Sequence, residues 1–461
     1  AYTLLYSGGL KIYSTQDPDI QAICDTVYSN EENYPENSKW ALDYRLSITK
    51  ANGETQNHSK EMYRRYFREN GKPNFNLLYS THEDAYADIE IYKAAVLEAG
   101  DSVLAESIDL TPQPQVSLTI ADQSTGHVVA MIGGRGTKDK SRTLNRATST
   151  TRPPGSTFKV LASFGPAVDS GIFTLASIIN DAPFFYYDGS PVRNWYSNSD
   201  TPYRGLMSIR EGIYNSLNIV AVKTITQITP QLGFDYLENL GFTTLEVAKE
   251  IDGKIYSDIQ QTLSLGGLTK GVTNMELNAA YACIANGGTY IEPKLYTKVV
   301  DHDGNIILDN TVSETRQVFK ETTAYLLTSA MEDTLTIGSG RAANFSGMPT
   351  AGKTGTTTDD LDVWFSGFTP YYTATTWTGY DDNNAKLAGA GLNLSKTMWK
   401  KVMSKIHENL PSKSFETPPN IVQATVCARS GKLPIAGLCD GTLKTEYFDF
   451  DFKPYKKKLI K

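Results

Sequence analysis

Three short motifs in this sequence combine the side chains that acyl transfer to a serine requires. In chain order they are Ser156-Thr157-Phe158-Lys159, Ser216-Leu217-Asn218 and Lys353-Thr354-Gly355-Thr356. A serine hydroxyl is a poor nucleophile until a neighbouring base takes its proton. A lysine can be that base if burial or a nearby cation lowers its pKa. The first motif therefore predicts Ser156 as a nucleophile and Lys159 as its base.

The surroundings of Ser156 distinguish it from a chance match. A serine three residues before a lysine is a weak signal alone, and Ser47 and Lys50 form a second such pair inside an ordinary polar stretch. Ser156 instead follows Pro153-Pro154-Gly155 and opens an apolar run, which is typical of the start of a helix. We therefore expect Ser156 and Lys159 one turn apart on one helix face. The alternative is a helix-capping serine beside a solvated lysine.

The second motif and the lysine of the third supply groups for proton transfer and binding. Ser216 could pass the proton to a leaving amine, and Asn218 can hydrogen-bond a peptide amide. Lys353 would add a second cation near Lys159 and lower the pKa of that amine further. The alternative for Ser216 and Asn218 is a polar turn between two helices.

The rest of the third motif predicts a substrate-binding strand. Gly355 would let another backbone approach closely, as a peptide added along a strand requires. Thr354 belongs to the same binding set, and Thr356 and Thr357 offer hydroxyls to a substrate carboxylate. The backbone N–H groups of Ser156 and Thr356 are candidates for an oxyanion hole.

The elements that must position these motifs can be read from hydrophobic alternation. Residues 115–132 form two alternating runs around Ser124-Thr125-Gly126, which predicts a β-hairpin with Val116, Leu118 and Ile120 on one face. Residues 155–285 are mainly helical in pattern. After Lys353, two β-branched and aromatic runs around Thr369-Pro370 predict a second hairpin.

These elements predict an α+β fold in which an antiparallel sheet is flanked by helices and interrupted by an inserted helical subdomain. With 461 residues, the chain should form two or three domains. Changes in composition predict an N-terminal α/β linker module at 1–90, a central domain at 91–410 and a small β-rich C-terminal domain at 411–461.

Composition excludes some functions. A net charge of −7 argues against a nucleic-acid-binding surface. The five histidines have no metal-ligand spacing, so we expect no metal and no cofactor. No apolar run could cross a bilayer, and the chain as given is expected to be soluble. Cys24 and Cys283 are isolated, whereas Cys427 and Cys439 flank a Gly/Pro-containing loop and could be bridged in an oxidising compartment.

A few further side chains can be assigned to ordinary structure. We expect Asp360 and Asp362 on a turn or solvated edge, and Trp195 and Trp364 in packing. Among the 27 tyrosines, Tyr196 and Tyr214 are weak candidates for lining a groove.

Together, the three motifs are the set found in penicillin-binding proteins and class A β-lactamases. The blocks around them resemble those of class A, bifunctional penicillin-binding proteins over most of residues 8–380. The last fifty residues resemble the C-terminal domain of Gram-positive members. Ser216-Leu217-Asn218 stands where the β-lactamases have Ser-Asp-Asn. The resembling blocks are 8–21, 124–134, 144–159, 208–222, 265–288 and 351–370.

The resemblance implies the serine β-lactamase/penicillin-binding transpeptidase fold and a peptidoglycan D,D-transpeptidase acylated on Ser156. It implies a D-Ala-D-Ala stem-peptide donor, an amine acceptor, and β-lactams as inhibitors. It further implies an ectodomain, without the family's glycosyltransferase domain, on the extracytoplasmic face of a bacterial membrane, with the full-length protein anchored there.

Three alternatives remain. The first is a D,D-carboxypeptidase, in which water replaces the acceptor amine. The second is a non-catalytic penicillin-binding sensor. The third is a β-lactamase, which needs a deacylating glutamate in an E-x-x-L-N loop, and Glu238-Asn239-Leu240 does not fit that pattern.

Overall fold

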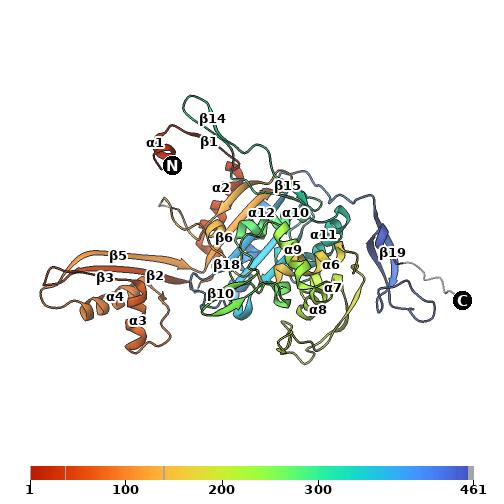
Figure 1. Ribbon diagram of the computed structural model, residues 1–461, viewed down its shortest axis with the longest axis horizontal. Coiled ribbons are helices and arrows are strands. Elements are labelled where there is room, and N and C mark those ends of the chain that lie inside the picture. Colours follow the sequence, from red (N-terminus) through yellow and green to blue (C-terminus); the bar gives the residue numbers. More distant parts are fainter. Residues whose placement is uncertain (1, 37, 139–140, 455–461) are drawn as a thin grey trace.

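A five-stranded antiparallel sheet forms the centre of the protein in the computed structural model, which describes residues 2–36, 38–138 and 141–454 (Figure 1). The strand order is β16-β17-β18-β6-β7. The two early strands and the three late strands thus form one sheet, as the alternation predicts. The strands are β6 Gln115–Asp122, β7 His127–Ile132, β16 Ala351–Thr356, β17 Asp362–Phe368 and β18 Tyr372–Gly379.

Both hairpins predicted from the sequence are confirmed, because β6 pairs with β7 and β17 pairs with β18 in antiparallel register. Val116, Leu118 and Ile120 lie in one apolar cluster with helices α2 (Pro18–Ser29) and α12 (Leu394–Ile406), so they share a face as expected. Helix α10 (Asn274–Ala285) packs against β6 and β18.

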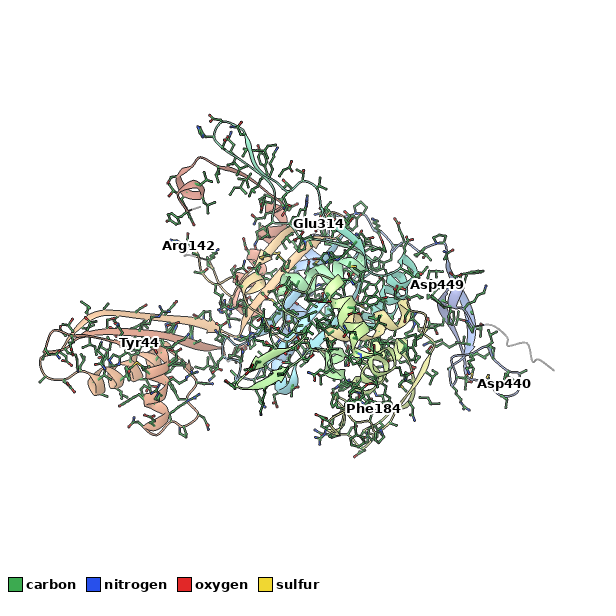
Figure 2. All side chains as sticks on the ribbon, viewed as in Figure 1. Tyr44, Arg142, Phe184, Glu314, Asp440 and Asp449 are labelled. Atoms are coloured by element: carbon green, nitrogen blue, oxygen red, sulfur yellow. The ribbon has the colours of Figure 1, made fainter. Side chains whose placement is uncertain are left out.

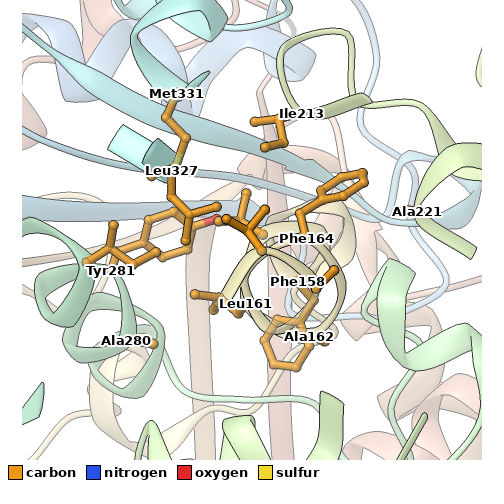
Figure 3. Packing of buried hydrophobic residues seen from close by; sticks show 14 of the residues in the cluster. Phe158, Leu161, Ala162, Phe164, Ile213, Ala221, Ala280, Tyr281, Leu327 and Met331 are labelled. Carbon is orange, nitrogen blue, oxygen red and sulfur yellow. The ribbon is translucent and has the colours of Figure 1, made fainter. Parts of the chain in front are cut away.

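The segment between β7 and β16 is mostly helical and holds the largest apolar cluster. Figure 3 shows Phe158, Leu161 and Phe164, from the helix that follows Ser156, among residues of the neighbouring helices. This core fixes the helix that carries the candidate nucleophile. The helices of the segment are α5 Arg146–Ser149, the 3-10 turn η2 Gly155–Thr157, the π-helix η3 Lys159–Phe164, α6 Gly165–Asp169, α7 Ile209–Tyr214, α8 Asn218–Ile228, α9 Pro230–Asn239, η4 Gln261–Leu265, α10 and α11 Glu321–Thr336.

One short α-helix, several short strands and several 3-10 turns complete the described structure. They are α1 Tyr2–Ser7, β1 Lys11–Ser14, η1 Glu31–Asn33, β8 Ile178–Asp181, β9 Gly205–Ser208, β10 Lys249–Ile251, β11 Lys254–Tyr256, β12 Thr289–Ile291, β13 Tyr296–Val300, β14 Ile306–Asp309, β15 Thr315–Gln317, η5 Arg341–Ala343, η6 Thr358–Asp360, η7 Gly389–Asn393 and η8 Phe450–Phe452.

An N-terminal module with its own core projects from the body, at the left in Figure 1. It contains β2 Lys39–Thr49, β3 Thr55–His58, α3 Lys60–Glu69, β4 Leu78–Tyr79, α4 His82–Val96 and β5 Ser102–Gln113. Strand β5 pairs with β2 along its length, so the module continues past residue 90. Helix α2, in contrast, packs into the cluster of the main sheet. This packing differs from the division at residue 90 that composition suggested, because strand pairing joins segments far apart in sequence.

The C-terminal part is a β-hairpin of β19 Ile421–Cys427 and β20 Leu443–Asp449. It packs on the body through Val426 and Phe448, which contact Ala176. Cys427 and Cys439 are buried free thiols in this structure, and the pKa of Cys427 is lowered to about 6, first of all by a hydrogen bond with Cys439. Within the described residues, no helix is long and apolar enough to cross a membrane.

Candidate active site

Ser156 lies at the junction of two unusual helical turns. It belongs to the 3-10 turn η2, and Lys159 begins the π-helix η3, rather than both lying on one regular α-helix. The N–H of Gly165 donates to the carbonyl of Val160, a five-residue separation that is the π-helical pattern. Ser156 is half-buried and Lys159 fully buried, so the hydroxyl is reachable from outside while the amine is not.

Gly155 brings the nucleophile close to the edge of the sheet. Its φ is +56°, and a Cβ there would lie 2.7 Å from the carbonyl oxygen of Thr356 and 3.0 Å from its backbone nitrogen. A side chain at this position would force the two backbones apart. Glycine before the nucleophile therefore lets the first and third motifs meet.

Ser216 sits on a strained turn after helix α7. Its φ is +57°, in the left-handed region that a non-glycine residue rarely adopts. The hydroxyl oxygen of Ser216 accepts hydrogen bonds from Lys159 Nζ at 3.1 Å and from Lys353 Nζ at 2.8 Å. The three motifs thus converge on one hydroxyl.

The pKa of Lys159 is lowered well below that of an ordinary lysine, chiefly by burial and further by the positive charge of Lys353. Its Nζ also donates to the carbonyl of Ser216 at 2.6 Å and to Asn218 Oδ1 at 2.5 Å. Among the described residues, no hydrogen bond joins Lys159 to the Ser156 hydroxyl. The two residues nevertheless belong to consecutive turns, and hydrogen bonds of this kind are often long before substrate binds.

Lys353 is the second lysine of the site whose pKa is lowered. Burial, and then the charge of Lys396 on α12, lower its pKa to about 7. Besides Ser216, it donates to the carbonyl oxygen of Thr354 at 3.1 Å. A cation with this pKa changes charge within the physiological range of pH.

The third motif lies on β16, the edge strand of the central sheet. The N–H of Thr357 donates to the carbonyl of Asp362, and N–H groups alternate in direction along an antiparallel strand. The N–H of Thr356 therefore points away from β17, towards the open edge. The side chain of Thr356 is exposed, whereas Gly355 packs against Pro154 and Thr157 with no room for a side chain.

Two threonines of the predicted substrate-binding set, Thr354 and Thr357, have hydroxyls that already form hydrogen bonds within the protein. The hydroxyl of Thr354 bonds that of Ser339 at 3.0 Å. The hydroxyl of Thr357 accepts a hydrogen bond from the N–H of Asp362 at 2.9 Å. Thr356 is the member of the set with its side chain turned to solvent.

Asn218 opens helix α8 and is held by a neighbouring loop. Its Nδ2 donates to the carbonyl of Arg193 at 2.7 Å, and its backbone N–H donates to Asn194 Oδ1 at 2.9 Å. Asn194 is buried and donates in turn to Asp181 at 2.8 Å. This chain of hydrogen bonds fixes the amide beside Lys159.

Two positions that sequence reasoning missed join the motifs. Ser339 follows helix α11, and its N–H donates to the carbonyl of Tyr214, just before Ser216, while its hydroxyl reaches Thr354. It thereby links the second and third motifs. Asn194 was also missed. The Gly338-Ser339-Gly340 turn was the available signal for Ser339.

Three residues expected in ordinary structure, and one tyrosine expected to line a groove, can be compared with the structure. Trp364 packs as expected, since it is 1% exposed. Trp195 does not, because it is 65% exposed and donates to the carbonyl of Asn215. Asp362 is buried and accepts from Trp377 rather than lying on a solvated edge. Tyr196, a candidate for lining a groove, is buried, and its hydroxyl donates a hydrogen bond to Asp181.

Two family models match the chain. Residues 116–404 match the penicillin binding protein transpeptidase domain. Residues 417–455 match the C-terminal domain of penicillin-binding protein 1A. All three motifs lie inside the first match.

Curated relatives agree with these matches. Penicillin-binding protein 1A of Clostridium tetani is 35% identical over 353 residues, which cover 73% of this chain and 43% of that protein. Penicillin-binding protein 1A/1B of Bacillus subtilis is 29% identical over 364 residues, covering 74% of this chain and 38% of that protein. The chain therefore spans less than half the length of these relatives.

Solved structures share the fold. Penicillin-binding protein 1A from Haemophilus influenzae superposes with a TM-score of 0.68 at 20% identity, covering 98% of this chain and 74% of that one. The PonA1 protein of Mycobacterium tuberculosis in complex with penicillin V gives a TM-score of 0.63 at 20% identity, covering 91% of each chain.

Proposed function

Because this chain belongs to the class A penicillin-binding proteins and carries their transpeptidase domain, we propose that it is a peptidoglycan D,D-transpeptidase acting through an acyl-enzyme on Ser156. The observation that carries the proposal is the convergence of Lys159 and Lys353 on the hydroxyl of Ser216. It gives a proton path that joins all three motifs.

In the acylation step, the Ser156 oxygen attacks the carbonyl carbon of the penultimate D-Ala. Neutral Lys159 accepts the hydroxyl proton, which its lowered pKa supports. The N–H groups of Ser156 and Thr356 stabilise the negative charge on the carbonyl oxygen. The donor peptide lies along the open edge of β16, and Gly355 admits its backbone.

Acylation is completed when the C–N bond to the terminal D-Ala breaks: Ser216 delivers its proton to the leaving amine and takes from Lys159 the proton that came from Ser156. In the second half of the reaction, an amine from a neighbouring stem attacks the ester carbonyl and loses a proton to the Ser216–Lys159 pair. The new peptide bond forms as the ester C–O bond to Ser156 breaks, and Lys159 returns the proton to the Ser156 oxygen. Lys353 and Thr356 bind the donor carboxylate, Asn218 binds the peptide amide, and Thr354 and Thr357 support this strand.

β-Lactams fit the same site because they present a strained amide and a carboxylate in the donor's place. Opening of the ring would leave a covalent adduct on Ser156. Since the peptidoglycan substrate lies outside the cytoplasm, we place the protein on the extracytoplasmic face of a bacterial membrane, with the full-length protein anchored there.

We also propose that the chain has three parts. Strand pairing between β2 and β5 supports an N-terminal module that ends near residue 113. The transpeptidase domain would follow to about 410, and the C-terminal domain would take the remaining residues, of which 455–461 lie outside the described part.

A depsipeptide assay tests the proposal. The protein is incubated with a stem-peptide thioester and a D-amino acid acceptor, and the products are separated by mass, with Ser156→Ala as the control. The proposal expects the ligated acceptor product from the wild type alone. Hydrolysis without ligation would indicate a carboxypeptidase instead, and no turnover despite β-lactam acylation would indicate a sensor.

A further inference from the structure

Arg210 joins three separate elements behind the candidate active site. It lies on α7 and is 7% exposed. From there it donates to Glu446 of β20 and to Ser329 and Asp333 of α11. Five hydrogen bonds use all of its N–H groups: Nε to Glu446 Oε2 at 2.8 Å, Nη2 to Glu446 Oε1 at 2.6 Å and to Ser329 Oγ at 3.1 Å, and Nη1 to Asp333 Oδ2 at 2.8 Å and to the Ser329 carbonyl at 3.1 Å.

Glu446 brings the C-terminal hairpin into this junction. Glu446 is 2% exposed, and both of its carboxylate oxygens accept hydrogen bonds from the guanidinium. This bidentate arrangement is the strong form of an arginine–carboxylate pair. Oε1 of Glu446 also accepts the N–H of Tyr447. Figure 2 labels Asp449, three residues along β20, where this strand meets the body.

Helix α7 transmits the position of Arg210 to Ser216. The helix ends at Tyr214, and the next turn is closed by hydrogen bonds from the N–H of Ser216 to Ile213 and from that of Leu217 to Gly212. Ser216 is held in a left-handed conformation there. A strained residue of this kind keeps its conformation only when its surroundings hold it in place.

Helix α11, the other element bound by Arg210, leads to the third motif. Its end is followed by Ser339, which contacts both Tyr214 and Thr354. The Arg210 guanidinium therefore ties α7, which leads into the second motif, to α11, which leads to Ser339 beside the third motif.

From this arrangement we propose that Glu446 of the C-terminal hairpin is a positioning residue for the transpeptidase site, acting through Arg210 and helix α7 on Ser216. The inference rests on the proposed function for its kinetic consequence. It assigns the C-terminal hairpin a part in acylation although the hairpin contributes no atom to the site.

The physical basis is the cost of leaving buried donors without partners. Removing the Glu446 carboxylate deprives two guanidinium N–H groups of their acceptors in a water-poor place. The side chain would turn towards Asp333, which is more exposed than Glu446, and α7 would move with it. Ser216 would then lose the alignment that lets it bridge Lys159 and Lys353.

The test compares three variants of the whole chain. Glu446→Ala removes both acceptor oxygens, and Glu446→Gln keeps one. Asp449→Asn is the matched control, because Asp449 lies on the same strand and accepts a hydrogen bond from Thr322 of α11, but forms no hydrogen bond or ion pair with α7 in the described part of the chain. Acylation by a fluorescent penicillin gives the dissociation constant and the acylation rate constant separately. Hydrogen–deuterium exchange of residues 212–218 reports the Ser216 turn without any chemistry.

We expect Glu446→Ala to lower the acylation rate constant by roughly tenfold or more, Glu446→Gln by less, and the dissociation constant to change little. Exchange at 212–218 should rise in the same order. Asp449→Asn should leave both readouts within about twofold of the wild type.

Two results would overturn the inference. One is wild-type acylation and exchange in both Glu446 variants. The other is an equal loss in Asp449→Asn, which would show only that the hairpin must stay docked. If Glu446→Ala fails to fold, Glu446→Gln decides. A wild type that is never acylated would contradict the proposed function, while the exchange comparison would still judge Glu446.

Discussion

At the scale of single residues, the candidate site depends on two buried lysines that differ in task. Lys159 must be neutral to accept a proton, and both burial and Lys353 lower its pKa. Lys353 must be charged to attract a carboxylate, yet burial lowers its pKa to about 7. The two lysines are coupled, because above about pH 7 Lys353 loses its charge, and with it both the attraction for a carboxylate and one of the two causes that lower the pKa of Lys159.

The first prediction concerns the pH dependence of acylation. Above about pH 7, Lys353 in the free protein loses its charge, so the second-order acylation rate constant for a β-lactam should fall on the alkaline side. Lys353→Arg should keep the cation and hold the rate level to about pH 9, although its absolute rate will be lower. Stopped-flow acylation from pH 5 to 10 checks this. An identical alkaline decline in both proteins would contradict a role for the Lys353 charge.

At the scale of elements, catalysis requires that a helical turn and an edge strand touch. Gly155 makes this contact possible, because its backbone lies against that of Thr356. The contact brings together the two N–H groups proposed for the oxyanion hole. Among the described strands, none pairs with the other side of edge strand β16, which is where the proposed donor peptide would add.

The second prediction therefore compares two glycines with positive φ. Gly155→Ala should lower the acylation rate constant by about 100-fold or more, because the new methyl group pushes Thr356 away from the oxyanion position. Gly189 has φ +82° and open space around its Cβ position, so Gly189→Ala should stay within about twofold. Acylation kinetics and thermal unfolding of both variants provide the check. Equal losses in the two variants would contradict the close-contact argument.

Local patterns in the sequence predicted the elements well. Alternation gave both hairpins and the apolar face of β6, and the Pro-Pro-Gly run located the turn that carries Ser156. The π-helical register of Lys159 and the left-handed Ser216 were not predictable, because packing around them, rather than local preference, decides those conformations.

Contacts between distant segments account for the other differences. The pairing of β2 with β5 supports an N-terminal module that extends past residue 90, and the buried Asp362 accepts a hydrogen bond from Trp377 of the next strand. Arg210 and Glu446 are 236 positions apart, and the local sequence around either residue does not predict a contact with the other. A contact between residues so far apart in one sequence can be predicted only when the fold is already known from a related protein.

At the scale of the whole molecule, the N-terminal module is separate from the catalytic body. Its core is an apolar cluster distinct from the two that surround the main sheet. At the end of β5 that adjoins the body, Gln113 donates a hydrogen bond to Asp381. The candidate site lies within the body.

The third prediction is that this module can be removed. Ala41 and Thr111 are directly paired on β2 and β5, so a two-residue Asn-Gly turn can join them after deletion of Leu42–Leu110. The shortened protein should unfold cooperatively and be acylated within about twofold of the original rate. Calorimetry and fluorescent penicillin labelling test it. Aggregation, or a large loss of acylation, would show that the module supports the site.

The most direct test of the central claim is the intact mass of the protein after incubation with a β-lactam, compared with Ser156→Ala. The proposed mechanism predicts one drug equivalent on the wild type, persisting for many minutes, and none on the variant, whose thermal unfolding should be unchanged. An adduct of the same yield on Ser156→Ala would contradict the claim that Ser156 is the nucleophile. Absence of an adduct from the wild type, together with no acylation by a stem-peptide thioester, would contradict the proposed enzyme itself.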